Sequence, residues 1–353
     1  MRNILITGGC GFIGSNLAVT LSSRGHSITC FDNLARRGSE VLLHRIKAAG
    51  CHFVHGDIRC MEDLQRISGR FDLIIECSAE PSVLVGTQGA DASFMVNNNL
   101  IGSLNCFELA RQRRMAILFL STSRVYPYDG LNRLSFSEGE TRFEYADNAS
   151  GVSANGVSVD FPINGARSLY GATKLASEIM LQEYSQSYDL PAVINRCGVV
   201  AGPWQLGKVD QGVFTFWLAQ HYFGKDLKYI GFGGKGKQVR DLLHIQDLVN
   251  LIEKQIARIE EFRGQVFNVG GSTYSSLSLQ ETTELCQKIT GKTVPIDASP
   301  VDRLADVVWY VTDNGDTEAT FQWRPERNPE TILTDIFEWL RENESTFTGL
   351  LKG

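Results

Sequence analysis

Seven short apolar runs, separated by segments of helix length, constrain the fold of this chain more than any other feature. The runs are residues 4–6, 28–31, 53–54, 73–75, 117–120, 193–194 and 266–269. Strands that lack polar alternation are typical of a parallel sheet covered by helices on both faces. The sequence therefore predicts an α/β fold built on a doubly wound parallel sheet.

The regular alternation fades after about residue 196, and a glycine- and lysine-rich stretch at 233–237 interrupts the chain before the last apolar run. We expect two domains. The sheet domain is predicted to contain residues 1–195 plus about 240–270. A smaller C-terminal α/β domain is predicted to contain about 196–239 plus 271–353. The polar segment 136–167 is expected to be a long loop, and such loops usually have a function.

Composition narrows the class of partner. A chain of 353 residues with 43% hydrophobic content can bury a large core, and its net charge of −6 gives no general attraction to nucleic acid or an anionic membrane. We expect a small-molecule ligand. There is no charged-then-apolar leader and no apolar run long enough to span a bilayer, so a cytoplasmic location is expected. The eight cysteines and six histidines are dispersed, which predicts reduced thiols and no metal site.

A glycine-rich segment, residues 8–14 (GGCGFIG), follows the first predicted strand and precedes a helix. In that context glycines let the backbone approach a pyrophosphate, and the helix N-terminus stabilises its charge. The second apolar run ends at Asp32, whose carboxylate can accept hydrogen bonds from an adenosine ribose. Because a carboxylate repels a 2′-phosphate, these signals favour a Rossmann-like site for NAD, although Arg36 and Arg37 leave NADP open.

Tyr170 and Lys174 are four residues apart, the spacing that places two side chains on one face of a helix. A phenol has a pKa of about 10, and a nearby cation favours the phenolate and lowers that value. The pair can therefore supply a base, although a single match of this kind is common on surface helices. An apolar stripe on the same predicted helix, from about residue 169, is expected to pack on the sheet and to leave Tyr170 and Lys174 facing a ligand. The stripe consists of Ala172, Leu175, Ala176, Ile179 and Met180.

Taken together, these motifs resemble the extended short-chain dehydrogenase/reductase family of enzymes that modify nucleotide sugars. The resemblance covers nearly the whole chain and includes residues 121–126 (STSRVY) and the segment from Arg196 to Pro203. It implies a nucleotide-diphosphate sugar as substrate, bound by the C-terminal domain, and a homodimer. It also implies that NAD is held by Gly8, Gly11, Phe12, Ile13, Gly14, Asp32, Asn33, Asp57, Ile58, Cys77, Ser78, Ala79, Asn99, Tyr170, Lys174, Arg196 and Cys197.

The same resemblance assigns the catalytic and substrate-binding residues. Thr122, or its neighbour Ser121 or Ser123 if the register differs, would hydrogen-bond the sugar hydroxyl that is oxidised. Tyr170 would take the proton of that hydroxyl, and Lys174 would assist Tyr170 and hold the nicotinamide ribose. Relatives usually carry His-Leu-Ala-Ala where this chain has Glu76-Cys77-Ser78-Ala79, and only backbone contacts are expected there. Substrate binding is assigned to Thr122, Ser123, Arg124, Gln211, Gln238, Arg240 and Arg303.

Several local segments resemble the CDP-paratose (CDP-tyvelose) 2-epimerases within this family, among them residues 53–59, 210–212 and 236–241. The implied reaction is oxidation at C2 of the sugar by tightly bound NAD, rotation of the keto sugar, and hydride return to the other face. Family dehydratases follow the catalytic Thr with Asp-Glu, and here Ser123-Arg124 follows, which disfavours 4,6-dehydration. A 4-epimerase, a net dehydrogenase and a non-catalytic NAD-responsive binding protein remain as alternatives.

Overall fold

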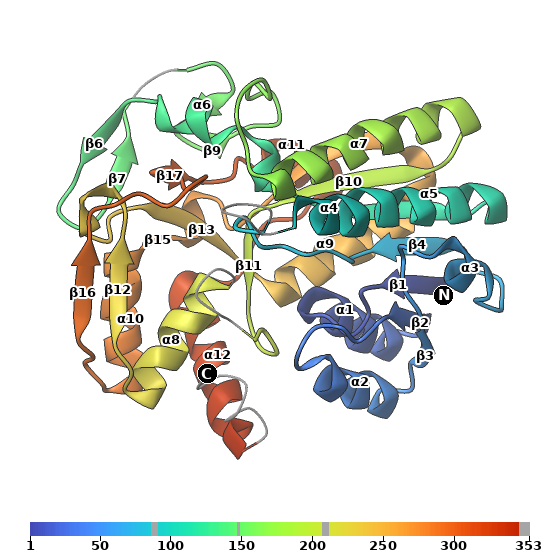
Figure 1. Ribbon diagram of the computed structural model, residues 1–353, viewed down its shortest axis with the longest axis horizontal. Coiled ribbons are helices and arrows are strands. Elements are labelled where there is room, and N and C mark those ends of the chain that lie inside the picture. Colours follow the sequence, from blue (N-terminus) through green and yellow to red (C-terminus); the bar gives the residue numbers. More distant parts are fainter. Residues whose placement is uncertain (86–90, 147–148, 207–211, 346–353) are drawn as a thin grey trace. The chain divides into compact units, whose positions relative to one another are not determined.

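The computed structural model describes residues 1–85, 91–146, 149–206 and 212–345 (Figure 1). The chain divides into two compact units. Unit 1 comprises Met1–Val125, Ser168–Arg196 and Val249–Phe267, and unit 2 comprises Tyr126–Arg167, Cys197–Leu248 and Asn268–Gly353. Residues 126–167, which the sequence-based boundaries place with the sheet domain, belong to unit 2.

Unit 1 is built on a seven-stranded sheet with the order β14-β10-β5-β4-β1-β2-β3. All seven apolar runs form its strands, so the predicted parallel α/β sheet is confirmed. The recorded pairings of β1 with β2 and β4, of β2 with β3 and of β4 with β5 are parallel. The strands are β1 (Asn3–Thr7), β2 (Ser27–Asp32), β3 (His52–His55), β4 (Leu73–Glu76), β5 (Ala116–Thr122), β10 (Ala192–Cys197) and β14 (Arg263–Val269).

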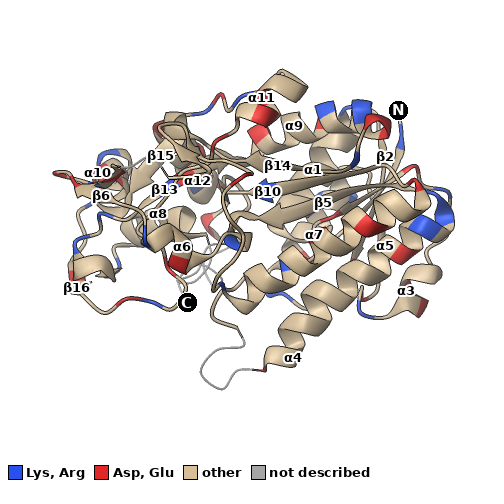
Figure 2. Ribbon diagram, turned by 90° about the horizontal axis from the view of Figure 1, so that it is seen from above, with Lys and Arg blue, Asp and Glu red and all other residues tan. Residues whose placement is uncertain are grey.

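Helices lie on both faces of this sheet, as a doubly wound fold requires. Figure 2 shows α5 and α7 on one side of the strands and α1 and α9 on the other. The helical segments are α1 (Phe12–Ser23), α2 (Ser39–Ala48), α3 (Met61–Gln65), α4 (Ala92–Met95), the π-helix η1 (Val96–Ile101), α5 (Gly102–Arg113), the 3-10 turn η2 (Ser123–Val125), α7 (Leu169–Tyr188), α9 (Ile245–Arg258) and the 3-10 turn η4 (Ile259–Glu261).

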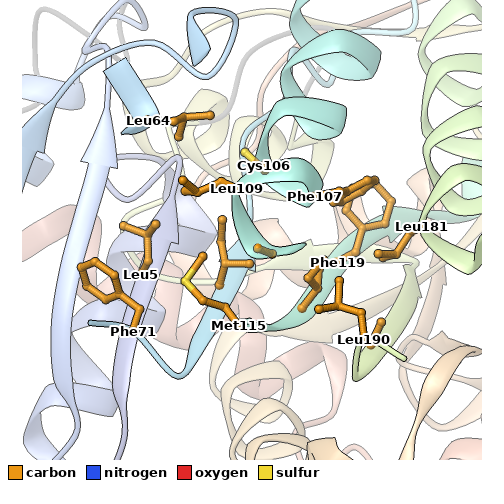
Figure 3. Packing of buried hydrophobic residues seen from close by; sticks show 14 of the residues in the cluster. Leu5, Leu64, Phe71, Cys106, Phe107, Leu109, Met115, Phe119, Leu181 and Leu190 are labelled. Carbon is orange, nitrogen blue, oxygen red and sulfur yellow. The ribbon is translucent and has the colours of Figure 1, made fainter. Parts of the chain in front are cut away.

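The core between the sheet and the α3, α5 and α7 side is a continuous apolar cluster (Figure 3). Phe107 of α5 meets Phe119 of β5 edge to face, with ring centroids 5.4 Å apart. Leu181 of α7 and Leu5 of β1 are fully buried in the same cluster. Burial of this apolar area holds α5 and α7 on the sheet, because each Å² removed from water stabilises the fold by about 25 cal/mol.

Unit 2 contains smaller sheets. Strand β13 pairs with β11, β15 and β17, while β12 pairs with β16. Its strands are β6 (Phe136–Glu138), β7 (Phe143–Tyr145), β8 (Val152–Ser153), β9 (Gly156–Val157), β11 (Val199–Ala201), β12 (Leu227–Ile230), β13 (Val239–His244), β15 (Ser276–Ser278), β16 (Ile296–Ser299) and β17 (Trp309–Tyr310). Its helical segments are α6 (Tyr128–Asn132), α8 (Val213–Phe223), η3 (Phe232–Gly234), η5 (Thr273–Ser275), α10 (Leu279–Thr290), α11 (Gly315–Phe321) and α12 (Pro329–Glu342).

The segment expected to be a long loop, residues 136–167, contains two short hairpins, β6–β7 and β8–β9. Val157 exchanges backbone hydrogen bonds with the chain around Thr312, accepting from Asp313 N and donating to Val311 O. Arg142 forms an ion pair with Glu281 at the start of α10. Backbone pairing and this ion pair therefore join the segment to the body of unit 2.

No helix in the described parts of the chain is both long enough and apolar enough to cross a membrane. Those parts also hold no group of three or more His, Cys, Asp or Glu side chains that could bind a metal ion.

Candidate active site

The glycine-rich turn joins β1 to α1 and leaves the N-terminus of that helix open. Gly11 is the N-cap residue, and because glycine has no side chain the amides of the first turn are not capped by one. A Cβ on Gly14 would lie 2.2 Å from the carbonyl oxygen of Gly8, so the turn can close only with glycine there. First-turn amides that no side chain caps suit the charge of a pyrophosphate. The local structure fits the predicted dinucleotide.

Acidic and amide side chains gather where β2 and β3 end. The Asp32 carboxylate accepts hydrogen bonds from the amides of Cys10 (3.0 Å) and Leu34 (2.8 Å), which fix it beside the glycine-rich turn. Burial raises the pKa of Asp32, and these two hydrogen bonds oppose the shift. Asn33 donates to Asp57 at 2.9 Å, so the predicted ribose and adenine ends lie together. Arg59 bonds to Asp57 and lowers the pKa of that carboxyl to about 2.

Several predicted cofactor residues have structural partners. Ile58 is buried in the core, where its side chain packs against Gly102. Asn99 is fully buried and exchanges hydrogen bonds with the backbone of Glu80, at 2.8 Å and 2.9 Å. Through these two bonds Asn99 anchors the segment after β4.

Arg196, near the end of β10, forms a buried ion pair with Glu178 of α7, with a nitrogen–oxygen distance of 2.8 Å. Glu178 also accepts a hydrogen bond from Ser121, the neighbour of Thr122. Cys197, which follows Arg196, is buried. These contacts tie α7 to the ends of β5 and β10.

The three predicted catalytic residues come from two adjoining elements of unit 1. Thr122 is the last residue of β5, and its hydroxyl accepts a hydrogen bond from Arg124 N at 3.2 Å. A Cβ on Gly171 would lie 2.0 Å from the carbonyl oxygen of Arg124. Since no larger residue fits there, Gly171 lets the first turn of α7 pack directly against η2. Tyr170 and Lys174, which flank this contact, are thereby held beside the segment that follows Thr122.

Helix α7 begins at Leu169, as predicted, with Ser168 as its N-cap accepting from Gly171 N at 3.2 Å. The predicted orientation of the helix is wrong. Of the apolar stripe, Ala172, Ile179 and Met180 are exposed and Leu175 and Ala176 are half-buried. The buried face instead carries Gly171, Thr173, Lys174, Ser177, Glu178, Leu181 and Ser185. The packing surface of α7 follows its small and polar residues, which allow a close approach to η1, η2 and β5.

Lys174 is buried, and its ammonium has two neighbours that sequence reasoning did not identify. Nζ lies 3.4 Å from Oε2 of Glu76 and 3.9 Å from the ring centroid of Phe119. Glu76 is fully buried at the end of β4. Burial raises its pKa, and the charge of Lys174 opposes that shift. A carboxylate directly after the apolar run 73–75, at the end of a central strand, is the sequence signal that could have identified this position.

In unit 2 the predicted diphosphate-binding arginines adjoin each other. Arg240 of β13 donates to Asp306 at 2.5 Å, and Asp306 N donates to Arg303 O at 3.2 Å. Gln238 is buried, and its amide nitrogen donates to Ile230 O at 3.2 Å. Gln211 lies outside the described residues. The structure thus brings Arg240 and Arg303 to one region of unit 2.

Comparison with known proteins adds the family. The model of the NAD dependent epimerase/dehydratase family matches residues 4–270. The chain belongs to this family. It is 31% identical to the CDP-paratose 2-epimerase of Salmonella typhi, over 95% of this chain and 98% of that protein. It also resembles the crystal structure of UDP-glucose 4-epimerase from Thermotoga maritima with UDP-glucose, with a TM-score of 0.78, 26% identity and coverage of 97% and 99%.

A second solved relative is the UDP-glucose 4-epimerase of Thermus thermophilus in complex with NAD, with a TM-score of 0.76, 25% identity and coverage of 96% and 99%. The predicted fold, the NAD cofactor and the assignment to nucleotide-sugar epimerases are confirmed. The protein is therefore an NAD-dependent enzyme of nucleotide-sugar epimerisation.

Proposed function

We propose that the protein inverts C2 of a CDP-activated sugar, in the manner of a CDP-paratose 2-epimerase. The observation that carries this proposal is the 31% identity to such an enzyme over 95% of the chain. The Ser123-Arg124 pair after Thr122 argues against 4,6-dehydration, because the acid and base carboxylates that dehydration needs are absent from those two positions. Inversion at C4, the reaction named for the UDP-glucose relatives, is the second candidate.

In this proposal Thr122 orients the reacting sugar hydroxyl by a hydrogen bond, and Tyr170 takes the hydroxyl proton and later returns it. Lys174, one helical turn after Tyr170, favours the deprotonated phenol through its charge. Bound NAD would supply a group that can accept a hydride from the sugar and give it back, so the reaction would cause no net oxidation. Arg124 and Ser123 of η2 would contact the sugar.

Each unit has a proposed role. Unit 1 holds NAD through the glycine-rich turn and α1, Asp32, Asn33 and Asp57, and the segments around Cys77, Asn99 and Arg196. Unit 2 binds the nucleotide diphosphate through Arg240 and Arg303, whose planar guanidinium groups suit phosphate oxygens. Gln238 and Gln211 are proposed to contact the same ligand.

We also propose that the protein is a cytoplasmic homodimer. The exposed part of the apolar stripe on α7, including Ile179 (51% exposed) and Met180 (38%), supports a subunit interface along this helix, because such a face is stabilised by burial. The eight free cysteines suit a reducing compartment.

Proton NMR tests the reaction directly. Purified protein is incubated with CDP-paratose and, in parallel, with UDP-glucose, and the coupling constants at C2 and C4 are followed. We expect inversion at C2 of the CDP-sugar without steady accumulation of reduced cofactor. Inversion at C4 of UDP-glucose alone would replace the proposal by its alternative, and lasting reduction of the cofactor would indicate a net dehydrogenase.

A further inference from the structure

The catalytic proposal leaves Glu76 without a role, yet this carboxylate is fully buried at the carboxyl end of a central strand. In register it lies opposite Thr7 of β1 and Phe119 of β5, at the edge where the glycine-rich turn begins. An unpaired charge in such a place is strongly unfavourable. The side chain must therefore be either paired or neutral.

Three elements hold the Glu76 carboxylate in place. Its Oε1 atom accepts a hydrogen bond from Ser78 N at 2.9 Å. Oε2 lies 3.5 Å from the hydroxyl of Ser103 of α5 and shares its proton with the carbonyl oxygen of Asn99, which is 2.8 Å from that hydroxyl. Oε2 also lies 3.4 Å from Nζ of Lys174. Contacts to the strand end, to α5 and to α7 fix the carboxylate, so it can in turn fix the ammonium.

Two further titratable side chains on the helices that pack here, Cys106 and Glu178, carry no uncompensated charge. Burial and the nearby Glu76 carboxylate raise the pKa of the Cys106 thiol on α5 well above its usual range, so that thiol stays neutral. On α7, Glu178 is paired with Arg196. Phe119 presents its ring face to Lys174 and does not titrate. Glu76 is thus the counter-ion of Lys174.

We propose that Glu76 is a positioning residue that acts through Lys174: it holds the ammonium at the end of β4 and, by its negative charge, sets the pH range over which Tyr170 exchanges a proton with the substrate. This inference rests on the proposed catalytic roles of Tyr170 and Lys174. The proton moves between the sugar hydroxyl and the Tyr170 oxygen, and neither the Lys174 ammonium nor the Glu76 carboxylate takes part in that transfer.

Glu76→Gln removes the negative charge and keeps the shape of the side chain. A nearby anion makes a phenol harder to deprotonate, so its removal should move the Tyr170 ionisation to lower pH, by about one pH unit. The ionisation of Tyr170 can be followed without substrate or turnover. The ultraviolet absorbance of phenolate is titrated in each protein and in the same protein carrying Tyr170→Phe, and the difference isolates Tyr170.

Two further variants keep the test decisive. Ser103→Ala removes one hydrogen bond to the carboxylate, which disfavours its charged form, so a smaller shift in the same direction is expected even if Glu76→Gln does not fold. Glu76→Asp retains the charge and should restore the titration toward that of the unmodified protein. The matched control is Glu281→Gln, which removes a carboxylate paired with Arg142 in unit 2 and should leave the Tyr170 step in place.

The outcomes separate this inference from the proposed function. A Tyr170 step that stays at the same pH in both Glu76→Gln and Ser103→Ala would overturn the role of Glu76, whatever the enzyme's activity. A step that moves as expected in a protein with no epimerase activity would support the role of Glu76 and contradict the proposed reaction. With an active substrate, the limb of the kcat profile that reports Tyr170 should shift to lower pH in Glu76→Gln.

Discussion

The two faces of α7 reverse the usual arrangement of an amphipathic helix. One face carries Lys174, Ser177 and Glu178 and is buried, whereas the face with Ile179 and Met180 is exposed. The α12 helix of unit 2 is conventional, since Ile332, Leu333, Ile336, Trp339 and Leu340 are all buried. A helix that places polar groups in the interior packs there through small and polar residues, and its larger apolar residues lie on the opposite face. Its remaining apolar residues then become available to a partner.

Among the substitutions on the buried and exposed faces of α7, loss of the Tyr170 hydroxyl should have the largest effect, and that effect is on turnover. Tyr170→Phe is expected to lower turnover by about 10²–10⁴-fold, because it removes the proposed base, while the protein keeps its NAD. Turnover is measured by NMR and cofactor content by absorbance of the heat-extracted nucleotide. Tyr184→Phe on the same helix is the control and should retain turnover. Full turnover by Tyr170→Phe would refute the catalytic assignment.

The second-largest effect is expected from breaking the buried ion pair between Lys174 and Glu76, and it is on stability. Lys174→Met leaves Glu76 without its cation, which should reduce the free energy of unfolding by about 3 kcal/mol at neutral pH. The pKa of Glu76 is raised in the folded state, so the folded protein binds its proton more tightly than the unfolded chain does. The free energy of unfolding therefore falls as the pH rises through the folded-state pKa of Glu76. The difference in this free energy between Lys174→Met and the unmodified protein should be larger at about pH 8 than at about pH 5.

Urea unfolding at the two pH values measures this difference. The control is Lys288→Met, because Lys288 forms an exposed ion pair with Glu330 and is expected to show no such pH dependence. An equal loss at both pH values in Lys174→Met would show that Glu76 is not the group responsible.

Core truncation separates the two faces energetically. Leu181→Ala removes a fully buried side chain from the cluster in Figure 3 and should reduce the free energy of unfolding by about 2–4 kcal/mol. Met180→Ala, the adjacent residue on the exposed face, should change the stability of the monomer by less than about 0.5 kcal/mol. Comparable losses of unfolding free energy in the two variants, measured at protein concentrations below the dissociation constant of the dimer, would contradict the assignment of faces.

The smallest effect on the fold is expected from a charge on the exposed face. Ile179→Lys should convert the proposed dimer to monomer, because a lysine cannot be buried there without a partner, and should change monomer stability little. Sedimentation velocity measures the molecular mass. Lys254→Glu, an exposed charge reversal on α9, should leave the mass unchanged. A monomeric unmodified protein, or a dimeric Ile179→Lys variant, would exclude this helix as the interface.

Much of the fold could be predicted from the sequence because its signals are local. The apolar runs predict the strands, and the N-cap Ser168 lies directly before the predicted start of α7. The orientation of α7 could not be predicted from periodicity, because the spacing of apolar residues does not determine whether a sheet or a second subunit covers them. The actual contact depends on Gly171 meeting the Arg124 carbonyl, a non-local fit between chain segments.

The candidate site shows the same division. The glycine-rich turn and Asp32 are close in sequence, and the structure joins them by the hydrogen bond from Cys10. Glu76 and Lys174 are 98 positions apart, and no spacing rule links them. The charge at the end of an apolar strand could be noticed, but its partner depends on which helix crosses the end of β4.

If residues 123 and 124 contact the sugar as proposed, the close contact at Gly171 also limits how substrate preference can change. The backbone after Thr122 is packed directly against the first turn of α7, which leaves no room for that backbone to move toward the helix. Residues 123 and 124 can exchange one side chain for another, but insertions or loop shifts at this point would displace Tyr170 and Lys174. New sugars would therefore be accommodated by altered side chains on an unchanged backbone.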